Sequence, residues 1–266
     1  PNTNLTLAAI RVFPLKGARA VAADRAEVTP RGLSGDRCWM VVDERGRFVS
    51  QRSHPGLALV RSTLGPDGLV LAAEGRNPVA CSFPDGGPRM KVEVWRDTVD
   101  VAPGSEAASR WLSDLLGQPC TLVHQDRRDS RPITSSRGFP GETVSFADGF
   151  PLLLCSEDSL ADLNGRLSDP VPMDRFRPNL VVRGGGPFAE DRWGHLAIGR
   201  ARFRNAGPCA RCAVTTVDQA TGRKGVEPLR TLATYRQGPS GVIFGVNLVP
   251  ERPGTVKVGD SVRILS

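Results

Sequence analysis

The strongest constraint on the fold is a series of short apolar segments separated by turn-forming residues. Gly (29) and Pro (22) are frequent in this chain of 266 residues, well above their combined average of roughly 12%. Regularly spaced short strands with intervening turns predict an antiparallel barrel or sandwich. The expected strands cover residues 7–13, 38–42, 48–50, 57–62, 69–72, 92–95, 179–183, 214–217, 241–249 and 254–265.

Helices are expected at only three places. Residues 105–116 repeat apolar side chains at helical spacing and are followed by Gly117, which is typical of a helix end. A second helix begins with the capping residue Ser156 and two acidic residues, and a third begins near Glu227-Pro228. The pattern therefore predicts a β-rich α+β protein in two parts, with a linker near 126–141.

Composition excludes several classes of protein. No segment approaches the roughly 20 apolar residues of a membrane span, and the start of the chain lacks the pattern of a signal peptide. The net charge of +7 is accompanied by a single Tyr, so we expect no nucleic-acid partner. The arginine-rich run of Arg127, Arg128, Arg131 and Arg137 is expected to be a solvated, partly mobile loop. Six scattered cysteines favour a reducing cytoplasm over a disulfide framework.

The sharpest local motif is the pair Cys209 and Cys212, at C-x-x-C spacing before the expected strand 214–217. A structural zinc site needs more ligands nearby, and a thioredoxin-like dithiol needs a following helix. A simple packing role stays open. So does a single reactive thiolate at Cys212, because the adjacent Arg211 favours the charged form, which is the nucleophile and metal ligand.

Basic residues stand at the ends of three expected strands. These are Lys16 followed by Gly17, Arg37, and the pair Arg175 and Arg177. Each one alone suits a solvated strand end, but together they favour a shared pocket for an anion, since the guanidinium group matches phosphate. The run from Gly184 to Ala189 matches G-x-G-x-x-A only formally, because no crossover helix follows it.

The order of several sequence blocks resembles the MOSC family with its N-terminal β-barrel domain, and within it the mitochondrial amidoxime reducing component and its bacterial relatives. The resemblance covers nearly the whole chain. The blocks are Pro-Leu-Lys-Gly, Gly-Asp-Arg-Cys-Trp-Met-Val-Val-Asp, Phe-Pro-Leu-Leu-Leu-Cys-Ser-Glu-Asp-Ser-Leu-Ala-Asp-Leu-Asn, Arg-Phe-Arg-Pro-Asn-Leu-Val-Val, Pro-Cys-Ala-Arg-Cys-Ala-Val-Thr-Thr-Val-Asp, Glu-Pro-Leu-Arg-Thr-Leu-Ala-Thr-Tyr-Arg and Val-Gly-Asp-Ser-Val.

The resemblance implies an N-terminal β-barrel-like domain over 1–118 and a C-terminal MOSC β-barrel domain over 119–266. It implies a molybdenum–molybdopterin cofactor whose metal takes a third sulfur from Cys212, the catalytic residue. Cys209 is expected to be structural. The cofactor-binding positions that match the family are Lys16, Gly17, Arg37, Ser156, Arg177, Asn179, Arg211, Cys212 and Asn247.

The resemblance further implies a reductase of N-hydroxylated compounds, such as amidoximes and N-hydroxy bases, that cleaves the N–O bond with two electrons. A separate flavin, haem or Fe–S protein is expected to supply them, because no Fe–S domain or mitochondrial targeting segment is apparent. We expect a cytoplasmic monomer. Two alternatives remain: a sulfur carrier with a persulfide on Cys212, and a cofactor-binding protein without turnover. The chain departs from the mitochondrial relatives at Gly17, where they have serine, and at Gly184–Gly186, where they have a cysteine.

Overall fold

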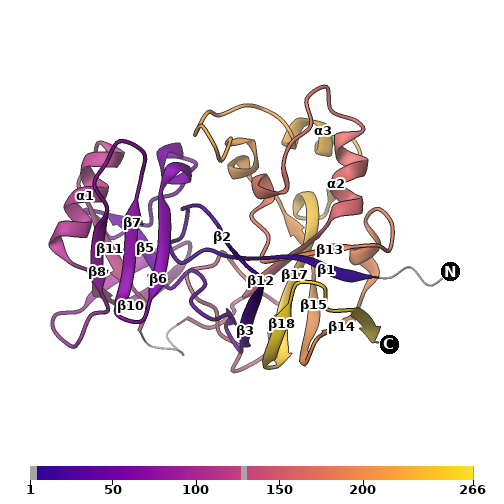
Figure 1. Ribbon diagram of the computed structural model, residues 1–266, viewed down its shortest axis with the longest axis horizontal. Helices are drawn as coiled ribbons and strands as arrows, with labels where there is room; N and C mark the ends of the chain where they lie inside the picture. The colour runs from indigo at the N-terminus through magenta and orange to yellow at the C-terminus, as the bar shows by residue number, and fades with distance from the viewer. Residues whose placement is uncertain (1–4, 127–130, 266) are drawn as a thin grey trace.

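The computed structural model describes residues 5–126 and 131–265, which form two lobes (Figure 1). The larger lobe is built on a nine-stranded sheet in which most neighbours are antiparallel, while β12 and β13 are parallel. The strands, in order across the sheet, are β19 (Val262–Leu265), β14 (His195–Ile198), β15 (Ala201–Ala210), β17 (Gly241–Arg252), β12 (Leu152–Ser156), β13 (Leu180–Arg183), β1 (Thr6–Val12) and β2 (Val21–Ala23), with β16 (Gln237–Gly238) paired to β17.

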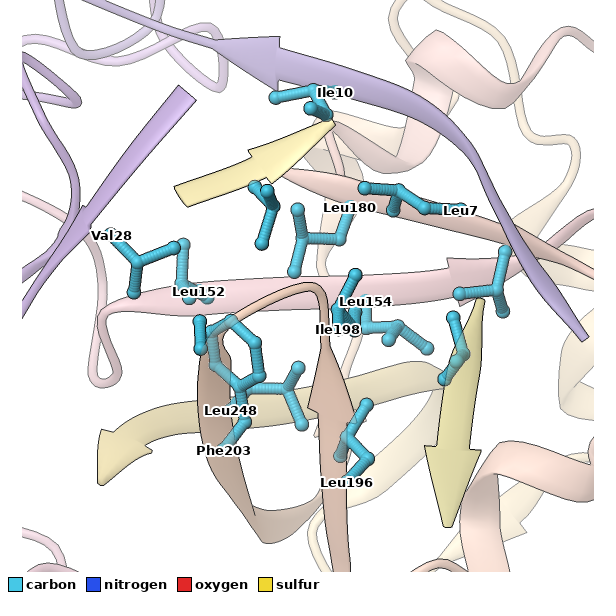
Figure 2. Close-up of a cluster of buried hydrophobic side chains, with 14 of the residues drawn as sticks. Leu7, Ile10, Val28, Leu152, Leu154, Leu180, Leu196, Ile198, Phe203 and Leu248 are labelled. Atoms are coloured by element: carbon cyan, nitrogen blue, oxygen red, sulfur yellow. The ribbon is translucent and has the colours of Figure 1, made fainter. Parts of the chain in front are cut away.

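The main core lies against this sheet. Figure 2 shows side chains from strands that are distant in sequence, including Leu7, Leu154 and Phe203, pointing toward one another. Each of the three is at most 1% exposed. All five residues of β12 are buried, as expected of a central strand that is covered on both faces. Burial on this scale makes the sheet a rigid base for the loops at its edges.

The smaller lobe holds a four-stranded and a three-stranded sheet with one helix beside them (Figure 1). The four-stranded sheet comprises β5 (Trp39–Asp43), β11 (Cys120–His124), β10 (Asp97–Pro103) and β9 (Met90–Val94); the three-stranded sheet comprises β6 (Arg61–Gly65), β7 (Gly68–Ala72) and β8 (Val79–Ser82). Another small sheet joins β18 (Gly254–Lys257), β3 (Arg25–Thr29) and β4 (Gly32–Leu33). The strand-rich architecture with few helices is the predicted β-rich α+β class.

Strand pairing does not follow the predicted chain division at 118/119. β1 pairs with β13 in the large sheet, and β3 pairs with β18 near the end of the chain. Conversely, β11 follows the predicted division but pairs with β5 in the smaller lobe. The first segment of the chain thus completes the C-terminal sheet through long-range pairing. The chain consequently crosses between the lobes before β5 and again after β11.

The predicted helix boundaries are confirmed where capping residues mark them. Helix α1 (Glu106–Leu116) begins after Ser105, whose hydroxyl accepts a hydrogen bond from the Ala108 amide, and ends at Gly117 with φ +69°. Helix α2 (Glu157–Asn164) begins after Ser156, which accepts from Asp158. Helix α3 (Leu229–Ala233) follows Pro228 and has only five residues. No helix in the described parts of the chain is both long and apolar enough to cross a membrane.

Four predicted strands are wrong in part or in full. Residues 48–50 form no strand, and Phe48 makes only an isolated bridge to Val42. The segment 254–265 is divided between β18 and β19, which belong to different sheets.

The segment 57–62 enters β6 only at Arg61, because Pro55–Leu59 forms a 3₁₀ helix. A short apolar run in a sequence fits a strand and a helical turn equally well. The segment 214–217 is also a 3₁₀ helix, Ala213–Thr216. There the Thr215 and Thr216 hydroxyls donate to carbonyl oxygens three residues earlier, at 2.9 and 2.8 Å, which favours a helical turn over a strand.

The predicted solvated arginine loop is wrong at Arg131, whose side chain is 2% exposed. Its guanidinium group donates to the carbonyl oxygens of Ser145, Ala147 and Asp148 and pairs with Asp97 at 2.9 Å. A turn that buries several carbonyl groups needs donors, and Arg131 provides them. Arg127 and Arg128 lie outside the described residues.

The central position of β12 predicts a large cost for truncating it. Leu154→Ala is expected to lower the free energy of unfolding by about 2–5 kcal/mol, because the removed side chain is fully buried. Ile264→Ala is the matched control at a residue 44% exposed and should change the free energy by no more than about 0.5 kcal/mol. Guanidinium chloride unfolding followed by circular dichroism measures both, and equal losses would contradict the assigned core.

Candidate active site

A cleft of about 310 Å³ lies between the two lobes and is lined by residues from both. Eight of the nine positions predicted to bind a cofactor line it. They are Lys16, Gly17, Arg37, Arg177, Asn179, Arg211, Cys212 and Asn247. Ser156 is the exception, because it is buried as the cap of α2. The cleft therefore gathers residues that are up to 231 positions apart in the sequence.

Two arginines share one aromatic ring at the base of the cleft. The guanidinium carbons of Arg37 and Arg177 each lie 4.4 Å from the centre of the Phe13 ring. Arg37 also donates to the Asn179 side-chain oxygen at 2.9 Å and pairs with the buried Asp36 carboxylate. Cation–π contacts and directed hydrogen bonds hold these groups although their charges repel each other.

The backbone at both arginines is strained. Arg37 has φ +49° and Arg177 has φ +56°, a left-handed conformation that costs about 1–2 kcal/mol for an L residue with a side chain. In Arg177 this conformation ends the 3₁₀ helix Met173–Phe176 and is followed closely by β13. Strain of this kind is often found at functional sites, and here it coincides with the two guanidinium groups of the cleft.

Burial lowers the pKa of Arg177 to about 9, and the positive charge of Arg37 adds to the effect. The guanidinium group donates to the Gln219 side-chain oxygen at 3.2 Å, so its hydrogen bond is to a neutral group. Gln219 is itself fixed by a reciprocal amide pair with Gln51, with N–O distances of 2.9 and 2.8 Å. Arg177 is thus a positioned cation with room for an anion beside it.

Lys16 follows β1 and is 7% exposed. Its ammonium group donates to the Phe146 carbonyl oxygen at 2.7 Å and to the Asp148 carboxylate at 2.6 Å. Burial lowers the pKa of Lys16 against the opposing effect of Asp148. Asp148 also accepts a hydrogen bond from the Trp95 indole at 3.2 Å. This carboxylate is the part of the cleft lining that offsets positive charge.

The two cysteines of the C-x-x-C motif lie at the end of β15. Cys209 is within the strand, whereas Cys212 precedes the short helix Ala213–Thr216; both are half-buried and line the cleft. Arg211 donates to the Cys209 sulfur at 2.9 Å and to the Phe176 carbonyl oxygen at 2.7 Å. The guanidinium group therefore contacts Cys209 directly, although Cys212 is its neighbour in the sequence.

Several residues of the cleft lining were not predicted from the sequence. Arg52 lies beyond a hairpin turn in the smaller lobe, and Asp148 lies in the connection before β12. Arg137 is exposed, as expected of a solvated loop, and it also lines the cleft. The sequence carries no signal that links Arg137 to the cleft. In the structure Gly207, with φ +97°, makes room for it, because a Cβ atom there would come within 2.0 Å of the Arg137 guanidinium group.

Comparison with known proteins identifies the family. The model for the MOSC domain matches residues 141–263, and the model for the MOSC N-terminal beta barrel domain matches residues 4–119. The chain belongs to the MOSC family. Residues from both matched ranges line the cleft.

Curated relatives match this chain over most of its length. Mitochondrial amidoxime-reducing component 1 of Homo sapiens is 37% identical, over 98% of this chain and 83% of the relative. Mitochondrial amidoxime reducing component 2 of Bos taurus is 34% identical, over 97% and 82% respectively. Molybdenum cofactor sulfurase of Oryza sativa is 31% identical, over 92% of this chain but only 32% of the relative.

The lowered pKa of Arg177 predicts pH-dependent anion binding. The group carries its charge below about pH 9 and loses it above that pH, so an anion should bind and stabilise the protein less as pH rises through 9. Sulfate at about 100 times its Kd should add about 2.7 kcal/mol at pH 7.5 and clearly less at pH 10. Thermal unfolding at matched ionic strength measures this effect.

Arg177→Met is the control for that measurement, because the general stabilising effect of sulfate is common to both proteins. The variant should lose most of the specific stabilisation at pH 7.5. Identical sulfate effects in the two proteins would contradict the assigned anion site.

Proposed function

We propose that this protein binds a molybdenum–pterin cofactor in the cleft and reduces N-hydroxylated compounds. The observation that carries the proposal is the combination of an accessible thiol, Cys212, with positioned cations from both lobes on one cleft. The names of the relatives, amidoxime-reducing components, support the same chemistry.

The residues present fit such a cofactor. A thiolate is a soft ligand that suits a sulfur-rich metal centre, and Cys212 is the half-buried cysteine beyond the strand end. A phosphate monoester carries about −1.5 to −2 charges. Arg177, whose guanidinium hydrogen bond is to a neutral amide, lies beside Arg37 to receive it. The buried Nε of Arg211 has no hydrogen-bond partner among the described residues.

Each residue then has a defined task. Cys212 holds the metal through sulfur. Lys16, Arg37 and Arg177 hold the phosphate end, with Asn179 fixing the orientation of Arg37. Gly17, Arg211 and Asn247 complete the walls around the pterin. Ser156 is left out of this set because it lies outside the lining and caps α2.

The bound cofactor supplies a two-electron couple for cleaving an N–O bond. In the overall reaction, an amidoxime takes up two electrons and two protons and gives an amidine and water. The chain's own contribution is to bind the cofactor, orient the substrate and limit access of solvent in a cleft enclosed by both lobes. The electrons come from a separate flavin, haem or Fe–S protein.

A second candidate function has support from one comparison. The similarity to molybdenum cofactor sulfurase favours a sulfur carrier in which Cys212 holds a persulfide. The two functions differ in what the purified protein contains. Mass spectrometry that finds a persulfide on Cys212, in protein that retains no molybdenum, would support the carrier in place of the reductase.

Substitution of the two cysteines tests the reductase. In protein made by a host that produces the cofactor, Cys212→Ser should lower benzamidoxime reduction by about a hundredfold or more, since a metal ligand is removed. Cys209→Ser is the matched control and should retain most activity. Steady-state assays with an artificial electron donor measure both; full activity in Cys212→Ser would contradict the proposal.

A further inference from the structure

Two arginines of the cleft lining have no task in cofactor binding. Arg52 comes from the smaller lobe and Arg137 from the long connection between the lobes. Within residues 5–126 and 131–265, neither forms an ion pair with a carboxylate. They are therefore cations available to something that enters the cleft.

Arg52 is held on an aromatic platform. Its guanidinium carbon lies 4.4 Å from the centre of the Trp95 ring and 5.7 Å from that of Phe48, and the two rings are 5.2 Å apart. Trp95 is 48% exposed and occupies the β9–β10 turn with φ +61°, an unfavourable conformation for a large side chain. Its indole hydrogen bond to Asp148 fixes the ring at the cleft.

Arg137 is positioned by contacts of its own. Its guanidinium group packs against the Cα atom of Gly207, where no side chain intervenes, and lies 5.8 Å from the centre of the Phe150 ring. The backbone carbonyl of Arg137 accepts a hydrogen bond from Arg204 at 3.0 Å. Arg204 in turn pairs with Glu142 at 2.8 Å, so the segment carrying Arg137 is tied to β15.

The charge balance leaves an excess at these two residues. The cleft lining holds six cationic side chains, namely Lys16, Arg37, Arg52, Arg137, Arg177 and Arg211, and among the described residues Asp148 is its one carboxylate. Asp36 lies beneath and pairs with Arg37. A cofactor phosphate adds at most about two negative charges. These negative groups lie with Lys16, Arg37 and Arg177, whereas Arg52 and Arg137 have no carboxylate partner among the described residues.

We propose that the substrate carries an anionic group, a carboxylate or a phosphate, in addition to its N–O bond, and that Arg52 and Arg137 bind this group. The inference rests on the proposed function and names its substrate class. A guanidinium group that lies on an aromatic ring can still present its in-plane N–H donors to an oxyanion. Phe48 and Phe150, which also line the cleft, offer apolar contact to a planar substrate body.

A matched pair of ligands tests the proposal directly. Benzamidoxime and 4-carboxybenzamidoxime share the N–O group and the ring, and they differ in one carboxylate. Isothermal titration with the cofactor-loaded protein should show that the carboxylate form binds about tenfold or more tightly. Raising the ionic strength should weaken this preference.

Single substitutions test which residues cause the tighter binding of the carboxylate ligand. Arg52→Gln and Arg137→Gln should each remove much of the preference while leaving benzamidoxime binding and molybdenum content unchanged. Arg110→Gln, on the exposed face of α1, is the control for net charge and should retain the full preference.

The outcomes separate this inference from the proposed function. Equal affinity for the two ligands, or no binding of the carboxylate form, would overturn the inference even if both are reduced. Loss of molybdenum from Arg52→Gln and Arg137→Gln would also overturn it, because these residues would then serve the cofactor, for example a second phosphate of a dinucleotide form. Preferential binding without reduction of either ligand would support the anion subsite and reject the reductase.

Discussion

The interaction on which the site depends is the shared contact of Arg37 and Arg177 with the ring of Phe13. Two like charges held close together in a partly buried environment are unfavourable in the free protein. Asp36 offsets one of them, whereas Gln219 offers the other only an amide oxygen. We therefore expect an anionic ligand to relieve this electrostatic cost, which would favour the binding of anions in the cleft.

The architecture of two lobes makes this arrangement possible. β1 pairs in the large sheet, and the chain then crosses to the smaller lobe, so that Lys16 and Arg37 line the same cleft as Arg177. Contacts between the lobes include the amide pair of Gln51 and Gln219. Because both amides are buried and satisfied, they fix the relative position of the two walls without adding charge to the cleft.

Much of the local structure was predictable, because the signals are local. Ser105 and Gly117 bound α1 through capping, and Lys16, Arg37 and Arg177 were recognisable as cations at strand ends. The order of the sequence blocks, which resembles the MOSC family, pointed to Cys212. Its identity as a metal ligand stays a prediction.

The errors arise where hydrogen bonds, either local or long-range, override the pattern of apolar residues. The threonines at 215 and 216 are β-branched and resemble a strand, but their hydroxyls bond to nearby carbonyl groups and stabilise a turn. Arg131 is buried because the 145–148 segment turns its carbonyl groups toward it. Arg52 and Arg137 reach the cleft only through long-range packing. The spacing of apolar residues along the sequence does not reveal such contacts.

The most direct measurement of the central claim is the molybdenum and pterin content per chain of protein purified from a host that makes the cofactor. We expect close to one molybdenum and one pterin per native chain and less molybdenum in Cys212→Ala. Both should be lost in a double variant that replaces Arg37 and Arg177 by Met. Folded native protein that contains neither molybdenum nor pterin would contradict the account.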